Sequence, residues 1–304
     1  MILCAGESLI DMVPEHGTFR PLAGGAVYNT TIAAGRLGED VAYLWPISRD
    51  PFGEMLLAPL NEAGVNLDLC PRSDRLTTLA LVTLDNGEAV YSFYDEGSAG
   101  RMLSVQDIPA LPDNISAIFA GGISLVPDPC GGAIESLIAQ NHSRLPVVLD
   151  PNIRPFFIQD EGAFRDRLNR IIPQCDIVKL SSDDLAWLYP GLDAQEAARK
   201  VLALGPKIVL QTGGAAGAHA YWSGETVTAP AIRTTVVDTI GAGDTFNAGV
   251  LASLRRQGVL GKDGLAQITA PAIKAALTLG AQAAAITVSR AGANPPWQHE
   301  MPGH

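Results

Sequence analysis

The sequence has little charge and few of the residues that build metal centres. Of its 304 residues, 17% are charged and 6% are aromatic, and it holds four cysteines and five histidines. The cysteines, at positions 4, 70, 130 and 175, are far apart, and no pair has the spacing of metal ligands. A zinc centre, a disulfide framework and a Cys–His nucleophile are therefore not expected.

Positive charge is especially scarce, since 21 Lys and Arg stand against 32 Asp and Glu and leave a net charge of −11. Nucleic acid and anionic membranes need basic counter-charge, so neither is expected as a partner. The first residues, Met1–Gly6, form an apolar strand-like run without the basic region and length of a signal peptide. No apolar run reaches membrane-spanning length, because even residues 272–288 include Lys274 and Gln282. A cytoplasmic location is expected.

Apolar runs that alternate with helical patterns are what the sequence does have. Strands are predicted at Ile115–Ala120, Pro146–Asp150, Cys175–Lys179 and Lys207–Gln211, with helices such as Ala163–Ile172 and Ala194–Leu204 between them. Strands that are apolar on both faces are typical of a parallel sheet covered by helices. The pattern predicts an α/β fold with a doubly wound, mostly parallel sheet.

A hairpin interrupts this alternation. Thr78–Leu84 and Ala89–Tyr94 read as two strands, and the Asn86-Gly87 pair between them is a strong hairpin signal. We expect these strands to form a small β lid together with Leu9–Val13 and Arg20–Leu22. The alternative is an antiparallel edge of the main sheet.

The motif with the most chemistry is Asp238-Thr-Ile-Gly-Ala-Gly-Asp244, which precedes an apolar helical run. A small-residue turn at a helix start exposes backbone N–H groups that bind anions. A carboxylate would repel the anion, so Asp244 needs a reason to be there, and general-base chemistry on a hydroxyl is one. The alternative reading of Asp244 is a helix cap.

A second glycine turn, Gly24-Gly25, opens another helical run and places Asn29 about one turn inside it. Asn29 can donate and accept hydrogen bonds, which suits a polyhydroxyl ligand. Asp11 ends a strand-like segment, where ligand residues gather in open α/β sheets. Arg154, after the strand that ends at Asp150, could clamp a phosphate or a substrate oxygen. Taken singly, these residues could also be turn glycines, caps or members of surface salt bridges.

A third glycine loop, Thr212-Gly-Gly214-Ala-Ala-Gly217, follows a predicted strand and could approach a nucleotide. It is not a P-loop, because no Gly-Lys-Ser/Thr follows, and it is not a GxGxxG turn. Any ATP site must therefore be of another type.

These motifs, in this order, resemble the ribokinase-like family of carbohydrate kinases, the PfkB family. The resemblance rests on the Gly24–Asn29 turn with the Ala-Gly-Arg-Leu-Gly38 run, on Asp50-Pro-Phe-Gly-Glu54, on Asp150-Pro-Asn152, on the Thr212–Gly217 loop and on the Asp238–Asp244 motif. It covers the chain nearly end to end. It implies one ribokinase-like kinase domain over residues 1–304, with the lid at about 9–22 and 78–99 closing over a sugar.

The resemblance also implies phosphoryl transfer from ATP, with Mg²⁺, to a sugar hydroxyl. It implies a general base, Asp244, beside an anion hole of N–H groups at Gly241, Ala242, Gly243 and Asp244. The implied sugar ligands are Asp11, Gly24, Gly25, Asn29 and Arg154, and the implied nucleotide loop contains Thr212, Gly214 and Gly217. Asp238 and the backbone of Ile240 resemble a monovalent-cation site, usually potassium. A homodimer through the lid is plausible by the same analogy.

Within the family the chain is most similar to bacterial fructokinases, through Arg154 and the stretch Phe93–Ala99. Kinases of 2-keto-3-deoxygluconate share these features, and other sugar or nucleoside kinases and a catalytically silent sugar-binding regulator are the remaining alternatives. One departure stands out, because Ser181 and Asp184 occupy positions where the family often has Asn-x-x-Glu around Mg²⁺. Asp184 is the candidate to contact Mg²⁺ through water.

Overall fold

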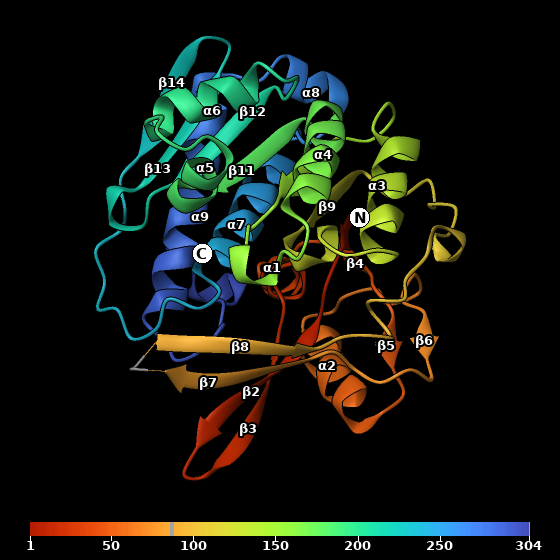
Figure 1. The fold of residues 1–304 in the computed structure, drawn as a ribbon. Helices are drawn as coiled ribbons and strands as arrows, with labels where there is room; N and C mark the ends of the chain where they lie inside the picture. Colours follow the sequence, from red (N-terminus) through yellow and green to blue (C-terminus); the bar gives the residue numbers. More distant parts are fainter. Residues whose placement is uncertain (86–87, 304) are drawn as a thin grey trace.

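The centre of the molecule is an eight-stranded sheet in the order β14-β13-β12-β11-β10-β9-β1-β4 (Figure 1). The computed structural model describes residues 1–85 and 88–303. The strands are β1 (Ile2–Ala5), β4 (Val41–Leu44), β9 (Ala117–Gly121), β10 (Val147–Asp150), β11 (Ile177–Ser181), β12 (Ile208–Thr212), β13 (Ala218–Trp222) and β14 (Glu225–Ala229). The pairs from β4 to β12 are parallel, and β13 and β14 add an antiparallel edge. The predicted doubly wound, mostly parallel sheet is confirmed.

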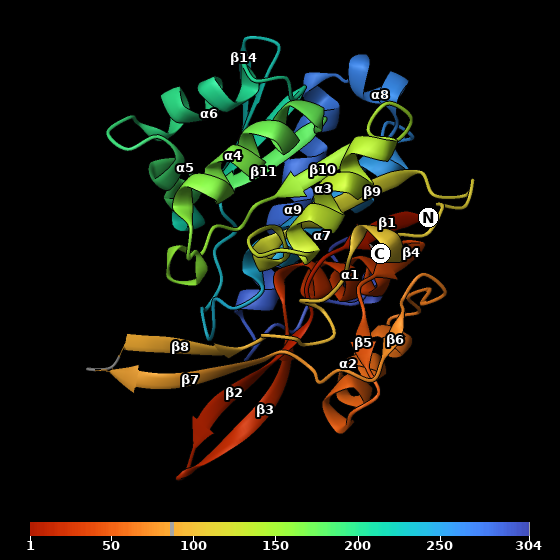
Figure 2. The ribbon, with the colours of Figure 1, turned by 45° about the vertical axis from the view of Figure 1, so that its right-hand side comes forward.

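Helices cover both faces of this sheet, as the turned view shows (Figure 2). One face carries α1 (Ala26–Arg36), α7 (Ala242–Arg256) and α9 (Ala270–Val288). The other carries α3 (Cys130–Asn141), α4 (Glu161–Ile171), α5 (Ser182–Leu188) and α6 (Ala194–Leu202). The remaining elements include α2 (Pro51–Glu62), α8 (Lys262–Ala266) and the short pair β5 (Ile47–Ser48) and β6 (Arg72–Ser73). Every residue of β1, β4, β9 and β10 is buried, as expected for strands covered on both faces.

Contrary to the expectation that no apolar run reaches membrane-spanning length, helix α9 is long and apolar enough, by length and composition alone, to cross a membrane. Its place in the fold explains this composition, because it packs along α7 and against β13 and β14. The two helices approach closely at glycines, since a Cβ added to Gly249 would lie 2.7 Å from the Cα of Gly280. The apolar sequence of α9 thus suits a helix of the protein core.

The predicted hairpin belongs to a second, four-stranded sheet, here called the small sheet, rather than to the edge of the main one. Its order is β3-β2-β7-β8. It contains β2 (Leu9–Glu15), β3 (Thr18–Gly24), β7 (Leu79–Asp85) and β8 (Glu88–Tyr94). Strands β2 and β7 pair in parallel and join two antiparallel hairpins. The predicted Asn86-Gly87 turn lies outside the described residues. The antiparallel edge of the main sheet is β13–β14 instead.

Polar contacts hold the base of the small sheet to the body. The Asp50 carboxylate caps α2 through the N–H of Gly53 at 2.7 Å. It also accepts from the N–H and the hydroxyl of Thr77, at 2.8 and 2.7 Å. The hydroxyls of Thr78 and Ser98 lie 2.8 Å apart. The base of β7 is therefore fixed against α2.

Aromatic rings make a second connection between the small sheet and the body. Tyr91 of β8 stacks on Phe156, with ring centroids 5.3 Å apart. Phe93, also on β8, meets Phe157 edge-on at 4.6 Å and stacks on Phe156 at 6.3 Å. Phe156 and Phe157 belong to the body segment between β10 and α4.

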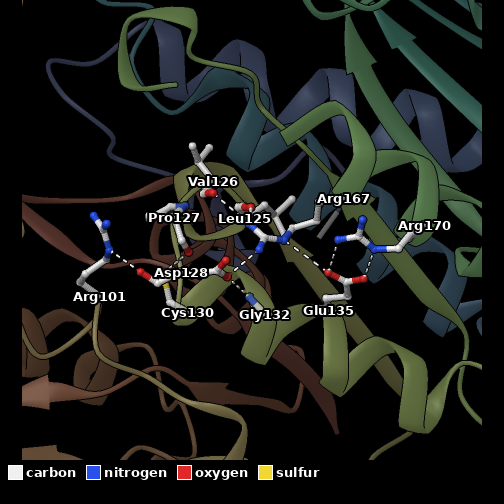
Figure 3. Close-up of polar contacts among 10 residues, drawn as sticks. All are labelled: Arg101, Leu125, Val126, Pro127, Asp128, Cys130, Gly132, Glu135, Arg167 and Arg170. Atoms are coloured by element: carbon white, nitrogen blue, oxygen red, sulfur yellow. Dashed lines mark hydrogen bonds and ion pairs between the residues drawn. The ribbon is translucent and has the colours of Figure 1, made fainter. Parts of the chain in front are cut away.

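A buried arginine organises the loop before α3 (Figure 3). The guanidinium of Arg167, whose side chain is 9% exposed, donates to the carbonyls of Leu125 and Val126 at 2.9 Å. It also pairs with Asp128 at 2.6 Å and with Glu135 at 3.4 Å. This one side chain links α4 to α3 and to the loop between β9 and α3.

Candidate functional site

The start of α7 lies beside the carboxyl-terminal ends of the central strands. Gly241 precedes the helix with φ +77°, and a Cβ there would lie 2.8 Å from the Cβ of Ala293, so glycine is required for both reasons. Ala242, Gly243 and Asp244 form the first turn, whose N–H groups lack intrahelical partners. The N–H of Ala242 donates to the carbonyl of Thr239 at 3.3 Å. The N–H groups of Gly241, Gly243 and Asp244 therefore remain the predicted anion cradle, and that of Ala242 already has an acceptor.

Asp244 is buried, with 8% of its surface exposed, and it is held from α1. The side-chain amide of Asn29 donates to its Oδ2 at 2.9 Å, and the hydroxyl of Thr30 donates to its carbonyl at 3.2 Å. Burial raises the pKa of Asp244 to about 7, partly offset by the Asn29 hydrogen bond and by the charges of Lys179 and Arg154. A carboxyl with a pKa near neutrality can accept a proton during a reaction.

The Gly24-Gly25 turn connects strand β3 of the small sheet to α1, and so lies near Asp244. A Cβ added to Gly24 would lie 2.5 Å from Oδ2 of Asp11, so this carboxylate packs directly on the turn. Burial raises the pKa of Asp11 to about 6. The turn leads into α1, which carries Asn29 to Asp244. The structure thus brings Asp11, the two glycines, Asn29 and Asp244 together, as the sequence predicted.

Arg154 lies at the margin of this group. Its guanidinium is exposed and donates to the carbonyl of its neighbour Ile153 at 3.1 Å. Its charge lowers the pKa of Asp244, where burial is the larger and opposite effect. Burial and the charge of Asp11 raise the pKa of Tyr91, and the charge of Arg154 lowers it. Arg154 is therefore close enough to influence both a catalytic candidate and the small sheet.

A buried ion pair behind the anion cradle was not predicted from the sequence. The Lys179 ammonium lies 3.0 Å from Oδ2 of Asp150, and both side chains are 4% exposed. The amide of Asn247 donates to the same oxygen at 2.7 Å. A Cβ built on Gly243 would lie 3.3 Å from the Lys179 nitrogen, which places the ammonium against the first turn of α7.

The Lys179 ammonium keeps its charge in this buried position. Burial alone would lower the pKa of Lys179, but the charges of Asp150, Asp184 and Asp244 outweigh it and hold the pKa above its usual value. The available signal in the sequence was a single lysine in an otherwise apolar buried strand, which is unusual unless the charge is paired.

Both carboxylate oxygens of Asp184 accept hydrogen bonds from neighbouring groups. Its Oδ1 accepts from the N–H of Ile153 at 2.8 Å, and its Oδ2 accepts from the N–H and the hydroxyl of Ser181, both at 2.7 Å. Ser181 in turn caps α5 by accepting from the N–H of Asp184 at 3.0 Å. The pair that replaces Asn-x-x-Glu thus forms a capping box and anchors the segment before Arg154.

The Thr212–Gly217 loop follows β12, so it lies at the same edge of the sheet as Ser181 at the end of β11. The N–H of Gly213 donates to the carbonyl of Gly217 at 2.9 Å, which closes a tight turn. Gly214 and Gly217 have φ of +55° and +88°. A Cβ on Gly217 would lie 2.4 Å from the carbonyl oxygen of Ala229.

The segment before α7 is fixed by Asp238. Its carboxylate accepts from the N–H of Ile240 at 3.0 Å and from the N–H of Gly292 at 2.9 Å. Ile240 is 57% exposed. In the part of the chain that the structure describes, no three His, Cys, Asp or Glu side chains come together as a metal site.

A cavity of about 890 Å³ lies between β8 and the starts of α3 and α4, next to the aromatic contacts that join the small sheet to the body. Phe93 and Phe157 are among its lining residues, whereas Asp11, Asn29 and Asp244 are not. The chemistry-bearing residues therefore converge beside this cavity and not within it.

Comparison with known proteins gives consistent results. Residues 1–300 match the family model described as pfkB family carbohydrate kinase. The chain is 45% identical to a fructokinase of Rhizobium leguminosarum bv. trifolii over 279 residues, which cover 90% of this chain and 86% of that protein. A crystal structure of a fructokinase with bound ATP from Xylella fastidiosa matches with a TM-score of 0.86 at 29% identity, covering 99% of this chain and 94% of that one.

A more distant structure shares the fold. A double mutant of the fructokinase from Vibrio cholerae O395, with fructose, ADP and potassium ion bound, matches with a TM-score of 0.84 at 23% identity. The match covers 96% of this chain and 93% of that chain. At this level of identity the similarity concerns the architecture alone.

Proposed function

The chain belongs to the pfkB family of carbohydrate kinases, and we propose that it is an ATP-dependent fructokinase. The observation that carries the proposal is the 2.9 Å contact between Asn29 and Asp244, which joins the two glycine turns into one site. The 45% identity to a fructokinase over most of both chains supports fructose as the acceptor.

In the proposed reaction Asp244 is the general base. It orients the acceptor hydroxyl of the sugar and takes its proton as the oxygen attacks the γ-phosphorus of ATP. The bond from that phosphorus to the bridging oxygen of ADP breaks as the new bond forms. The hydrogen bond from Asn29 leaves Oδ1 of Asp244 to face the sugar. A base of this kind contributes about 10²–10⁴ to the rate.

The negative charge of the migrating phosphoryl group is balanced by groups behind Asp244. The first-turn N–H groups of Gly243 and Asp244 are fixed by the helix, so they need no reorganisation during the reaction. The Lys179 ammonium lies against Gly243 and is paired with Asp150 on its other side, so its positive end also faces this end of α7. These donors act in a mostly buried setting, where water screens them little.

The sugar is bound by Asp11, Gly24, Gly25 and Asn29, with Arg154 at the margin. The glycine turn lets a ligand approach its backbone closely, and the carboxylate and amide accept from or donate to sugar hydroxyls. The small sheet (β2, β3, β7 and β8) is the proposed lid, and its strand β2 carries Asp11. By covering the sugar it would exclude water, which otherwise competes as a phosphoryl acceptor.

ATP enters as its Mg²⁺ complex, in which the ion neutralises phosphate charge. The Thr212–Gly217 loop is the proposed nucleotide site, with Thr212, Gly214 and Gly217 nearest to ATP. All the oxygens of Asp184 already accept backbone or Ser181 hydrogen bonds, so contact with Mg²⁺ through water would be additional to them. Asp238 and the backbone of Ile240 are the proposed K⁺ site, which would stiffen the turn before α7.

A second substrate is favoured by one observation. The guanidinium of Arg154 is exposed, and the bond that the structure gives it goes to the carbonyl of its own neighbour. It could therefore pair with the carboxylate of 2-keto-3-deoxygluconate. A sugar-binding regulator without activity is disfavoured, because the chain retains both Asp244 and the glycine turn in front of it, which sugar binding alone would not require.

We further propose a cytoplasmic homodimer that associates through the small sheet. Phe19 and Tyr94, on its two edge strands, are 43% and 64% exposed. Sedimentation of the wild type and of a Tyr94→Glu variant tests this, since the charge should shift the mass toward the monomer.

The main experiment measures ADP release with fructose, tagatose, ribose, 2-keto-3-deoxygluconate and adenosine, each in K⁺ and in Na⁺ buffer. Fructose should give the highest kcat/KM, with higher rates in K⁺. A higher kcat/KM for 2-keto-3-deoxygluconate would show that the sugar acid, and not fructose, is the substrate. If none of the five compounds gave ADP release, the proposal would be rejected.

A further inference from the structure

The residue Glu7 stands outside all the roles assigned so far, yet it is a fully enclosed carboxyl between two glycine turns. We propose that Glu7 is a positioning residue that sets the geometry of the sugar turn Gly24-Gly25 and thereby the affinity for sugar. The inference rests on the proposed function, because it takes this turn to be the sugar site.

Glu7 holds the start of α1 at three points. Its Oε1 accepts from the N–H of Ala26, the first residue of the helix, at 2.9 Å. Its backbone carbonyl accepts from the N–H of Tyr28 at 3.2 Å. The same carbonyl oxygen would lie 2.5 Å from a Cβ on Gly25, whose φ is +120°. The sugar turn is therefore shaped directly against Glu7.

The other carboxylate oxygen reaches the body of the protein. Oε2 accepts from the N–H of Ser124 at 3.2 Å, in the short helix η2 (Gly122–Leu125) that follows β9. Gly122, with φ +68°, packs so closely that a Cβ there would lie 2.0 Å from Oε1. The Glu7 side chain thus joins the start of α1, which follows the sugar turn, to the start of η2, which follows β9.

No cation balances this carboxyl in the described part of the chain, where the ion pairs do not include Glu7. Glu7 is 4% exposed, and burial raises its pKa to about 7, with the N–H donors opposing this effect and the Asp244 charge adding slightly to it. A buried carboxyl held only by N–H groups destabilises the fold relative to an apolar side chain of the same shape. Its presence is explained if those N–H groups must be held in one place.

The consequence for the site is geometric. Because Glu7 occupies the free N–H of Ala26, this helix start does not present that donor to the ligand. The remaining ligand groups at this turn are the backbone of Gly24-Gly25 and the side chain of Asn29. The backbone N–H of Asn29 donates to the Gly25 carbonyl at 2.8 Å. A shift of the turn would therefore move Asn29 as well.

The test is the Glu7→Gln variant, in which a carboxamide can accept from one N–H but turns its NH₂ group toward the other. The control is Asp176→Asn, which changes another buried carboxyl that accepts from the N–H of Val147 and from two lysines. Asp176 precedes β11 and so lies at the opposite edge of the sheet. Calorimetry measures fructose and ADP affinities, coupled assays measure kcat and KM, and melting curves measure stability.

We expect Glu7→Gln to weaken fructose binding and raise its KM at least tenfold, with ADP affinity and the KM for ATP within twofold of the wild type. The control should lose stability and keep its fructose affinity. Should Glu7→Gln not fold, Glu7→Asp replaces it, since a shorter arm cannot reach both N–H groups.

Unchanged fructose affinity, or an equal loss of fructose and ADP affinity, would overturn the role of Glu7. Absence of fructose-dependent ADP release from the wild type would instead overturn the proposed function, so the two failures are distinguishable.

Discussion

Asn29 and Asp244 are 215 residues apart in the sequence, and the amide of the first donates to the carboxylate of the second at 2.9 Å. The bond joins the first turn of α7 to α1, and so joins the proposed phosphoryl cradle to the proposed sugar turn. It also selects which carboxylate oxygen is free. Because Asn29 occupies Oδ2, the basic lone pairs of Oδ1 remain for a hydroxyl.

Replacing Asp244 by Asn should lower kcat by about 10²–10⁴ and leave the fructose KM within about threefold. The amide keeps the shape and can still accept from Asn29, but it cannot take a proton. Coupled ADP release measures both constants, and ADP affinity serves as the control for an intact nucleotide site. A kcat within tenfold of the wild type would show that another group is the base.

The pKa of about 7 at Asp244 predicts a pH dependence of activity. The base acts when deprotonated, so kcat/KM for fructose should rise about tenfold per unit below pH 7 and level off above it. Asp11, with a pKa of about 6, and Glu7, at about 7, should steepen the acid side. A kcat/KM that stays constant from pH 5.5 to 8 would contradict the assignment.

The same value predicts how Asp244 affects stability. Its folded pKa exceeds the unfolded value of about 3.9, so the unfolded chain loses this proton first as pH rises. The contribution of Asp244 to stability should therefore fall between about pH 4 and pH 7. In Asp244→Asn this part of the pH dependence should be lost, which denaturant unfolding at several pH values can measure. Identical slopes in the two proteins would contradict the raised pKa.

Removing one charge of the Lys179–Asp150 pair should destabilise the protein more than removing both charges. Lys179→Met leaves the Asp150 carboxylate buried without its cation and should cost about 3–5 kcal/mol of unfolding free energy. Adding Asp150→Asn should recover part of this loss, since the charge is then gone too. Both variants should have a lower kcat, because the cation beside Gly243 is missing. A double variant less stable than Lys179→Met would reject this account.

Arg167→Met should cost several kcal/mol of unfolding free energy with little change in kcat. The substitution leaves the buried carbonyls of Leu125 and Val126 without the Arg167 donor and removes one of the cations of Glu135, which keeps Arg170 (Figure 3). The matched control is Arg49→Met, because Arg49 pairs with Asp74 at side-chain exposures of 57% and 91%. That surface pair should contribute less than about 1 kcal/mol. Similar losses in the two variants would contradict the importance of burial.

Much of the architecture could be predicted from local pattern. Continuous apolar runs located β9 to β12 because strands covered on both faces have no polar alternation. The Gly-Ala-Gly turn located the start of α7, since only glycine takes the φ of Gly241 beside Ala293. The hairpin was identified from its turn residues and alternation. Its place in a separate sheet depended on β2, which pairs with β7 from far along the chain and brings β3 with it.

The rest depended on contacts that no local pattern records. Lys179 lies on β11 and Asp150 on β10. The parallel pairing of these two strands brings the side chains within 3.0 Å of each other. Ser181 and Asp184 matched a metal motif imperfectly, and the structure gives them a capping box that the spacing Ser-x-x-Asp also permits. Glu7 follows an apolar strand as an ordinary polar residue would, and its enclosure is visible only once β9 and α1 surround it.

The rings that join β8 to the body have a consequence for populations. Three ring pairs cross from Tyr91 and Phe93 to Phe156 and Phe157. Each such pair contributes about 0.5–1.5 kcal/mol beyond its buried area, so the three together contribute roughly 1.5–4.5 kcal/mol to the joined arrangement. A free-energy difference of this size corresponds to about one molecule in ten to one in two thousand with these contacts broken at any moment. Sugar exchange can therefore proceed through a minor state that exists before any ligand arrives.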